Sequence, residues 1–479
     1  MPDARTGLVA PSAEILARFA AIVGRGGVIT EAADQAPYLT EWRDLYTGRT
    51  PMVLLPATTA EVGAILALAH DARVAIVPQG GNTGLVGGQI PFEAGTEIVL
   101  SLSRMNRIRH LEQGGTHMVV EAGVTLLAAQ AAASRAGRLF PLSLASEGSC
   151  QIGGVLASNA GGVAVLAYGN ARNLALGLEV VLADGRVIEG LRALKKDNTG
   201  YDLRDLFIGS EGTLGVITAA CLKLFPQPAE KATAFVALGS IESVAELFAR
   251  AEVAAGGSLT AFEFLDDTGL SMVLDHIPDT RSPFADRHPW YVLMEVSGGR
   301  ADGGAAAALE SVLGAAVETG VVTDAAIAAT LTQAQALWRL RETLSEAQKP
   351  AGGSIKHDIS VPVAMIPQFI RTAAPLIERV CPGARPVPFG HFGDGNVHYN
   401  VSQPKGADRA AYLARWHVMS DEVHALVMGL NGSISAEHGI GRLKRDDLAR
   451  VKSPVEMDVM RAIKAALDPR GVLNPGKVL

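Results

Sequence analysis

Two segments near the C-terminus combine residue types that bind divalent metal ions. His391 and His398 flank a Gly-Asp-Gly turn, and a fold-back there can bring both imidazoles to one ion, which a straight strand could not do. Farther along the chain, Glu437 offers a carboxylate oxygen and His438 offers a base. Two histidines and one carboxylate with open positions suit Zn²⁺, Mn²⁺ or Fe²⁺. We therefore expect a metal site from these segments.

A plainer interpretation treats these residues as structural. His391 and His398 would then be ordinary strand residues, and Glu437 and His438 a solvated loop pair. A lone histidine is more often structural than ligating, but two glycine-flanked segments that each offer ligands favour the metal site. Asp394 is a rival ligand, although a position between two glycines is more typical of a residue that shapes the turn.

A glycine-rich loop, residues 78–88 with the sequence PQGGNTGLVGG, directly follows an apolar strand. Its five glycines let successive backbone N–H groups turn toward one point without Cβ clashes, as in loops that bind phosphate. No Lys-Ser/Thr pair follows, so it is not a Walker loop, and no G-x-G-x-x-G opens a helix, so a Rossmann site is not supported. The alternative is a mobile turn between strands.

Two more segments of small residues, 146–162 and 209–218, also admit close backbone approach to a flat or elongated ligand. They read SEGSCQIGGVLASNAGG and GSEGTLGVIT. Three such segments within one predicted domain indicate one long ligand.

These segments must be positioned by a mixed α+β framework. Apolar residues 52–55 and 74–77 predict strands, and a Thr-Thr-Ala-Glu capping box at 58–61 predicts a helix between them that ends near residue 72. Residues 178–188 predict a hairpin around an Asp-Gly turn. A Pro-Gln-Pro boundary at 226–228 begins a second domain, in which we expect residues 301–329 to form surface helix and loop.

Composition excludes several classes of protein. A chain of 479 residues is too long for one hydrophobic core, so we expect two or three domains that can be interleaved. The net charge of −7 without a long basic block argues against nucleic acid as the main ligand. No uncharged apolar run approaches the roughly 18 residues of a membrane-spanning helix. Three scattered cysteines and no secretory signal at residues 1–15 predict a reducing, cytoplasmic location.

The glycine segments, taken together with GLEVVLADG and GYDLRDLF, resemble the FAD-binding domain of the vanillyl-alcohol oxidase type over most of residues 50–228. The histidine segments, with WRLRE at 338–342, KHDIS at 356–360 and LNPGK at 473–477, resemble the FAD-linked D-2-hydroxy acid dehydrogenases. The resemblance implies an α+β protein with a two-subdomain FAD-binding domain at 1–228. It also implies an α/β substrate (cap) domain with metal ligands at 229–425 and a C-terminal helical segment, 426–479, that returns to the FAD domain.

The resemblance also assigns roles to individual residues. The first glycine loop would hold the FAD pyrophosphate. The residues implied to line FAD are Pro78, Gly80, Gly81, Asn82, Thr83, Gly84, Ser146, Gly148, Gly153, Ser158, Gly161, Gly215, Ile217 and Asn474. His391, His398 and Glu437 would bind a zinc-type ion. These loops contain no histidine and only Cys150 could form a tether, so we expect non-covalent FAD.

For the reaction we expect oxidation of a D-2-hydroxy acid, with hydride passing from Cα to flavin N5. The divalent ion would acidify the hydroxyl, His438 would remove its proton, and Asn400 would contact the substrate. By the resemblance, Arg341, Ser345 and Lys356 hold a distal carboxylate, which favours D-2-hydroxyglutarate over D-lactate or glycolate. Without the resemblance, Arg341 would be read as a surface residue paired with a neighbouring glutamate, and Lys356 as solvated.

Several alternatives stay open at the level of sequence. One is a flavin-free metal hydrolase that uses the C-terminal site alone, and another is a non-catalytic FAD-binding subunit of a larger complex. D-lactate or glycolate oxidation is the rival within the enzyme class. Electrons must leave to an external acceptor, which the resemblance implies is an electron-transferring flavoprotein or a quinone-linked carrier, with direct reduction of oxygen as a further option. A homodimer is the alternative to a monomer.

Overall fold

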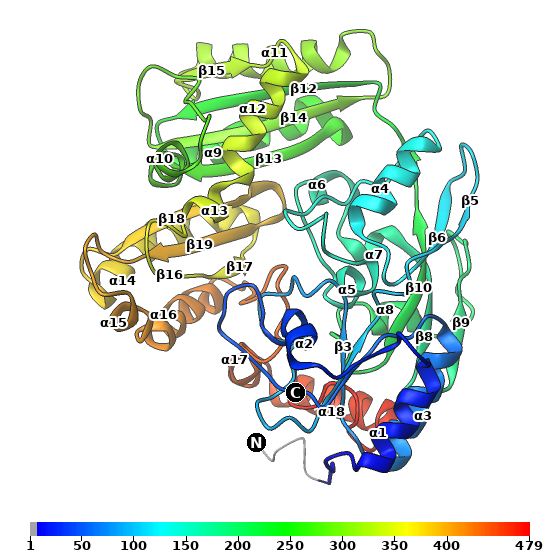
Figure 1. Ribbon diagram of the computed structural model, residues 1–479. Coiled ribbons are helices and arrows are strands. Elements are labelled where there is room, and N and C mark those ends of the chain that lie inside the picture. The colour runs from blue at the N-terminus through cyan, green and yellow to red at the C-terminus, as the bar shows by residue number, and fades with distance from the viewer. Residues whose placement is uncertain (1–6) are drawn as a thin grey trace. The chain divides into compact units, whose positions relative to one another are not determined.

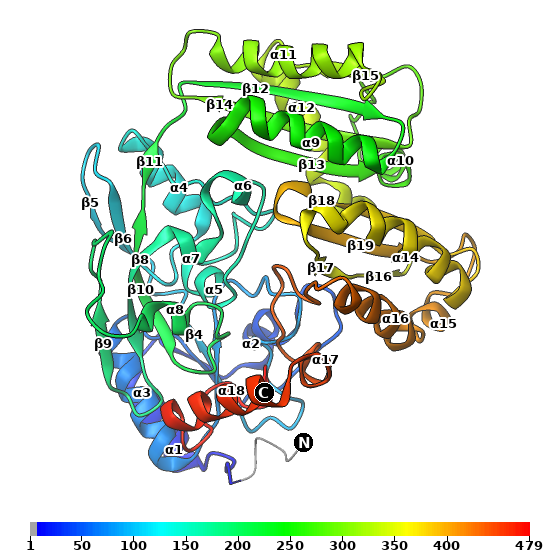
Figure 2. The same cartoon turned by 180° about the vertical axis from the view of Figure 1, so that it is seen from behind.

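The computed structural model of the protein describes residues 7–479. Residues 1–6, part of the stretch in which no secretory signal is predicted, lie outside the described residues. The chain divides into two compact units, and it passes between them more than once (Figures 1 and 2). The first unit comprises residues up to Gly161, Asn170–Pro226 and Glu437–Leu479; the second comprises Gly162–Gly169 and Gln227–Ala436.

The first unit begins with a four-stranded sheet in the order β1-β2-β4-β3. Its strands are β1 (Val28–Ile29), β2 (Val53–Leu54), β4 (Ile98–Ser101) and β3 (Ile76–Gln79). Both β2 and β3 run parallel to β4, which requires a crossover, and α3 (Thr59–Ala72) supplies part of it. Thr58 caps α3 by accepting from the backbone N–H of Glu61. The predicted strand, helix and strand are therefore confirmed.

A five-stranded antiparallel sheet in the order β5-β6-β10-β8-β9 completes the first unit's framework. Its strands are β5 (Ile108–Leu111), β6 (His117–Glu121), β10 (Val216–Lys223), β8 (Ala175–Val181) and β9 (Val187–Gly190). The hairpin predicted at the Asp-Gly turn is present between β8 and β9, and Gly185 adopts the positive φ that the turn requires. The short helix α5 (Ile152–Ala157) lies against β10 and β6.

The C-terminal segment belongs to the first unit and contains α17 (Arg445–Val451) and α18 (Pro454–Leu467). After α18, Val472 and Leu473 are fully buried in the same core as Ile76, and Leu473 forms a parallel bridge with Ile76. The end of the chain is thereby attached to the strand that leads into the first glycine loop.

The second unit is built on an eight-stranded sheet in the order β15-β12-β14-β13-β18-β19-β16, with β17 also paired to β19. The strands are β15 (Asp324–Ile327), β12 (Glu230–Leu238), β14 (Trp290–Gly298), β13 (Leu259–Asp266), β18 (Arg385–His391), β19 (Asn396–Ser402), β16 (Ser354–Ile355) and β17 (Asp358–Ser360). Every pairing in this sheet is antiparallel. Successive side chains of each strand point to opposite faces, so one strand can contribute residues to two different cores.

Helices cover both faces of this sheet, as the opposite views in Figures 1 and 2 show. One face packs against α9 (Ile241–Ala255), α11 (Gly304–Glu318), α14 (Ile366–Val380) and α16 (Trp416–Gly429). The other packs against α10 (Asp267–His276), α12 (Leu331–Glu342) and α13 (Leu344–Ala347). His391 on β18 lies on this second face, because it is separated by even numbers of residues from Val387 and Phe389, which belong to the second core.

The expectation of surface helix and loop over residues 301–329 is confirmed only in part: α11 is a helix with one exposed face, but a strand is present where loop was expected. Five residues of α11 are buried, among them Leu309 and Leu313, and residues 324–327 form the edge strand β15 beside β12. The alanine-rich composition obscured the helical periodicity, because alanine occurs on both the buried and the exposed face. Within residues 7–479, no helix is both long and apolar enough to cross a bilayer.

Candidate functional site

The three glycine-rich segments converge within the first unit, after β3. A Cβ atom at Gly81 would overlap the carbonyl oxygen of Ser149, so the first segment lies directly on the backbone of the second. A Cβ at Gly212 would come within 3.1 Å of Cγ of Pro78, which places the third segment on the first. Only residues without side chains allow this proximity at Gly81. The arrangement fits one ligand shared by all three segments.

Several polar side chains in these loops are used to hold the loops themselves. Asn82, which has a φ of 54°, donates from Nδ2 to the carbonyls of Pro37 and Thr40. Ser158 donates from Oγ to the carbonyl of Gly154. A Cβ at Gly148 or Gly154 would meet no atom within 4 Å, so the backbone there is approachable. A cradle lined by backbone N–H groups fits the pyrophosphate of FAD.

Cys150 lies in the second glycine segment and is buried. Burial raises the pKa of its thiol, so the nucleophilic thiolate is disfavoured. This supports the expectation that FAD binds without a covalent tether.

Glu211 is a residue of this region that sequence reasoning missed. It has a φ of 52°, and its carboxylate accepts the backbone N–H groups of Ile440 and Gly441 at 2.7 and 2.8 Å. Burial raises its pKa to about 7. Asn474 donates from Nδ2 to the carbonyls of Glu211 and Gly88, each at 2.9 Å. The sequence signal for Glu211 is that it is the single carboxylate within the glycine-rich run GSEGTLG.

Three further residues that were predicted to line FAD pack tightly within the first unit, namely Gly153, Gly215 and Ile217. A Cβ at Gly153 would come within 2.7 Å of Cβ of Ala122, and one at Gly215 within 2.7 Å of Cγ1 of Val180. Ile217 is buried in β10. Their role toward FAD stays a prediction, as it does for Gly80, Thr83, Gly84, Ser146 and Gly161.

In the second unit, the hairpin expected at the Gly-Asp-Gly turn is present between β18 and β19. Asp394 shapes the turn by accepting the backbone N–H of Asn396 at 3.0 Å. His391 is paired with Asn396 and His398 with Phe389 in the register, and the two imidazole centroids are 5.7 Å apart. The turn therefore brings both histidines to one face of the sheet.

His391 belongs to a buried chain of polar contacts. Its Nδ1 lies 2.7 Å from Oε1 of Glu263 on β13, and Oε2 of Glu263 lies 2.8 Å from Nη2 of Arg341 on α12. Burial acts to raise the pKa of Glu263, but the charges of His391 and Arg341 outweigh it and hold the pKa below its usual range. Arg341 is 8% exposed, which rules out the surface position that sequence alone suggested for it.

His398 has its own buried carboxylate. Oδ1 of Asp358 on β17 lies 3.7 Å from Nδ1 of His398, and it accepts a hydrogen bond from Nδ2 of Asn396. The backbone N–H of Ala436 approaches the carbonyl of Asp358 at 3.4 Å. The residues that immediately follow Ala436 are Glu437 and His438, so this backbone contact holds their segment beside β17.

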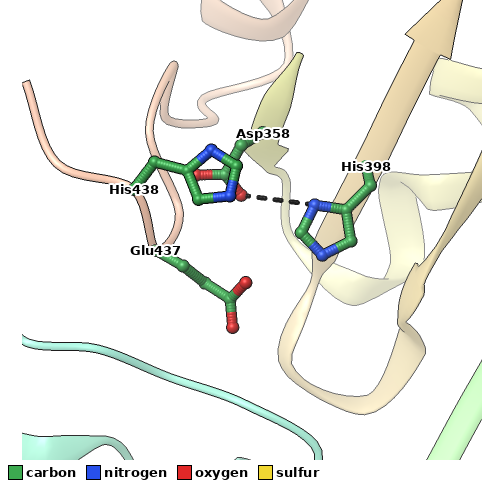
Figure 3. Close-up of side chains that lie close together, drawn as sticks. All are labelled: Asp358, His398, Glu437 and His438. Atoms are coloured by element: carbon green, nitrogen blue, oxygen red, sulfur yellow. Dashed lines mark ion pairs between the residues drawn. The ribbon is translucent and has the colours of Figure 1, made fainter. Parts of the chain in front are cut away.

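Asp358, His398, Glu437 and His438 each offer one ligand atom, and these four atoms lie within 4.8 Å of one another (Figure 3). Figure 3 shows Asp358 at one ring nitrogen of His398. A mixed set of imidazole nitrogens and carboxylate oxygens is the donor chemistry that zinc-type ions accept, so the residues fit a divalent metal. His391 is not in this group, and Asp358 was not predicted.

The predicted substrate residues lie near this face of the sheet. Asn400 on β19 is buried and donates from Nδ2 to Oε1 of Gln348 at 2.9 Å. Lys356 lies between β16 and β17, and Ser345 lies on α13, one helical turn after Arg341. Their contact with a substrate stays a prediction.

Two family models match the chain. A model of the FAD binding domain matches residues 50–190, and one described as FAD linked oxidases, C-terminal domain, matches residues 227–478. The first match establishes the FAD cofactor class and argues against the flavin-free hydrolase alternative. Neither match identifies a metal.

Curated relatives match nearly the whole chain. The mitochondrial D-2-hydroxyglutarate dehydrogenase of Bos taurus is 40% identical over 95% of this chain and 81% of that protein. That of Arabidopsis thaliana is 38% identical over 96% of this chain and 80% of its own length. The D-2-hydroxyglutarate dehydrogenase of Xanthomonas citri pv. viticola is 39% identical over 94% of this chain and 93% of that protein.

These relatives correct the predicted location. The Bos taurus and Arabidopsis thaliana proteins are mitochondrial by name, which contradicts the cytoplasmic expectation. That expectation depended on the lack of a recognisable signal, and such a lack does not identify a compartment.

Solved structures confirm the fold. The structure of p-cresol methylhydroxylase with substrate bound has a TM-score of 0.77 and 17% identity, and covers 99% of this chain and 98% of that one. The FAD-binding unit and the second unit, an antiparallel sheet covered by helices, thus have the α+β fold of the vanillyl-alcohol oxidase type, as the glycine motifs predicted. Motifs, family models and full-length relatives together show that the chain belongs to the FAD-linked D-2-hydroxy acid dehydrogenases.

Proposed function

We propose that the protein oxidises D-2-hydroxyglutarate to 2-oxoglutarate, with FAD as the hydride acceptor and a divalent metal ion at the histidine cluster. The observation that carries this proposal is the Glu263 contact chain. It places a guanidinium, suited to a carboxylate, on the same sheet face as the imidazole and carboxylate groups suited to a metal. The names of the full-length relatives support the same substrate.

Arg341 is the proposed anchor of the distal carboxylate. Its guanidinium lies 5.0 Å from the ring centroid of Phe389, and its buried Nε has no hydrogen-bond partner among the described residues. A buried N–H without a partner is costly, and a ligand carboxylate would satisfy it. Lys356 and Ser345 are proposed to complete this subsite. A monocarboxylate such as D-lactate would leave the subsite unused.

His391, His398 and Glu437 are the proposed metal ligands, with zinc as the proposed ion. When bound, the ion would supply Lewis-acid stabilisation of the developing alkoxide. Glu263 lies at hydrogen-bond distance, 2.7 Å, from Nδ1 of His391, so the neutral ring of His391 would carry its lone pair on Nε2. Asp358 lies 3.7 Å from Nδ1 of His398, which is ion-pair and not hydrogen-bond distance, so it would act on that ring through its charge.

His438 is the proposed general base. Imidazole titrates near neutral pH and can take the hydroxyl proton while hydride leaves Cα. FAD, held by the glycine loops, supplies the two-electron acceptor. Asn400 is proposed to orient the substrate, with its own amide held by Gln348. An electron-transferring flavoprotein or a quinone-linked carrier is the proposed external acceptor, and a homodimer is the proposed assembly.

The substrate assignment is tested by anaerobic mixing of the purified flavoprotein with single 2-hydroxy acids. The absorbance of oxidised flavin should bleach fastest with D-2-hydroxyglutarate, much more slowly with D-lactate or glycolate, and not with L-2-hydroxyglutarate. Equal or faster bleaching with D-lactate would overturn the dicarboxylate assignment. A preparation without flavin absorbance would overturn the cofactor.

A further inference from the structure

Glu263 is a buried carboxylate in the middle of β13, between Phe262 and Phe264. Its side chain is 1% exposed, and it lies opposite His391 in the pairing of β13 with β18. A carboxylate at a sheet position with this burial is destabilising unless charged or hydrogen-bonding partners compensate it. An apolar residue would serve better for packing alone.

Oε1 of Glu263 orients the imidazole ring of His391. With Nδ1 at 2.7 Å from Oε1, the imidazole donates its Nδ1–H to the carboxylate, and the neutral ring then carries its lone pair on Nε2. A histidine ligand almost always has its other nitrogen held in this way, which orients the ring and raises its basicity.

Oε2 of Glu263 holds the guanidinium of Arg341 in place. Nη2 of Arg341 lies 2.8 Å from Oε2, and the guanidinium is held against Phe389, which is two residues before His391 on β18. The long arginine side chain therefore has its head group fixed by Glu263 on one side and by an aromatic ring on another. Such preorganisation reduces the entropy lost when a carboxylate binds.

From these contacts we infer that Glu263 is a positioning residue that couples the two ends of the substrate site. One carboxylate sets the tautomer of the proposed metal ligand His391 and the geometry of the proposed carboxylate anchor Arg341. This inference rests on the proposed function, because it assigns the two partners their roles from that proposal. Glu263 itself touches neither metal nor substrate.

The test compares Glu263→Gln with Glu295→Gln. Glu295 is a matched control: it is buried on the neighbouring strand β14, faces the same side of the sheet, and contacts Lys231 and Trp338 but neither His391 nor Arg341. An amide retains the shape of Glu263 but loses the negative charge that pairs with Arg341 and holds His391. Zn²⁺ is titrated calorimetrically into the chelator-treated, FAD-loaded proteins, and turnover is measured with D-2-hydroxyglutarate and D-lactate.

We expect Glu263→Gln to weaken Zn²⁺ affinity by about 10–100-fold, as loss of a metal ligand's orienting partner usually does. The KM for D-2-hydroxyglutarate should rise about tenfold, while that for D-lactate changes little and kcat falls on both. A single substitution would thus affect both partners of Glu263: Zn²⁺ affinity through His391 and the KM for the dicarboxylate through Arg341. Glu295→Gln should retain the Zn²⁺ affinity and the KM of the wild type.

Unchanged Zn²⁺ affinity and unchanged KM in Glu263→Gln would overturn the inference. If that variant fails to fold, Glu263→Asp is measured, since it retains the charge but is one methylene shorter. Failure of both to fold while Glu295→Gln folds would make Glu263 a structural residue and also overturn it. A wild type that binds no Zn²⁺, or does not oxidise D-2-hydroxyglutarate, would instead contradict the proposed function.

Discussion

The glycine loops around β3 and the polar face of β13, β17, β18 and β19 build their sites in opposite ways. In the loops the surface proposed to bind FAD is backbone, and side chains such as that of Asn82 hold the loops in place. On the sheet face the chemistry is in side chains, and the backbone ladder only sets their spacing. Cofactor binding should therefore be sensitive to added atoms, and catalysis to lost functional groups.

Removal of the proposed base should have the largest effect. His438→Ala is expected to lower the rate of flavin reduction by D-2-hydroxyglutarate by about 10²–10⁴-fold, the usual contribution of a positioned base. Stopped-flow absorbance under anaerobic conditions measures this rate. The flavin content should equal that of the wild type, because the loops are unaltered.

A histidine that is exposed on α16, His417, provides the control. His417→Ala should reduce flavin at the wild-type rate. If His438→Ala also does so with its metal content retained, His438 is not the base.

Loss of the carboxylate anchor should have the next largest effect. Arg341→Met is expected to lower kcat/KM for D-2-hydroxyglutarate by about 30–100-fold, or about 2–3 kcal/mol, because a charge-assisted pair with the substrate is lost and Glu263 loses a partner. The same ratio for D-lactate should change much less. Arg339→Met on the exposed side of the same helix is the control, and an equal loss in both variants would refute the anchor role.

A single methyl group should damage the backbone-built site. Gly81→Ala places Cβ on the carbonyl oxygen of Ser149, where no side chain can move aside, so a loss of about 3 kcal/mol in unfolding free energy or of bound FAD is expected. Thermal unfolding and flavin content report it. Gly314→Ala on the exposed face of α11, where a Cβ meets nothing within 4 Å, should be neutral or slightly stabilising. A Gly81→Ala protein with full FAD content and stability would contradict the close packing of the loops.

The smallest expected effect is the pH dependence that Glu211 contributes. Its pKa is raised to about 7 from an ordinary 4.5, so its contribution to stability is fully present below about pH 4.5 and is lost as the pH rises through 7. Relative to Glu211→Gln, the wild type should lose about 2–3 kcal/mol of unfolding free energy between these pH values. Denaturant titrations at a series of pH values measure the difference. A difference that grows with pH would show that the pKa is lowered instead.

The backbone-built site could be predicted from sequence because its signal is local. Glycine spacing in residues 78–88 and the capping box before α3 depend on neighbours a few residues away. The helix capped by Thr58 is confirmed, whereas the contacts of the glycine loop with FAD stay a prediction. The His391 and His398 hairpin is local in the same sense.

The side-chain network could not be predicted, because it is assembled by sheet pairing. Glu263 and His391 are 128 residues apart and meet only because β13 pairs with β18. Asp358 joins His398 through the pairing of β17 with β19, and a buried Glu211 reaches Ile440 across 229 residues. The spacing of apolar residues within one segment does not indicate contacts with a distant segment. Arg341 was placed by resemblance, while its local sequence suggested a surface helix.

Removal of the metal tests most directly whether flavin reduction depends on the histidine cluster while FAD binding does not. The protein is treated with a chelator, its flavin absorbance is recorded, and D-2-hydroxyglutarate is added anaerobically before and after Zn²⁺ is restored. FAD should stay bound throughout, bleaching should be lost without metal, and Zn²⁺ should restore it. Bleaching at the full rate in protein shown to contain no metal would contradict this dependence.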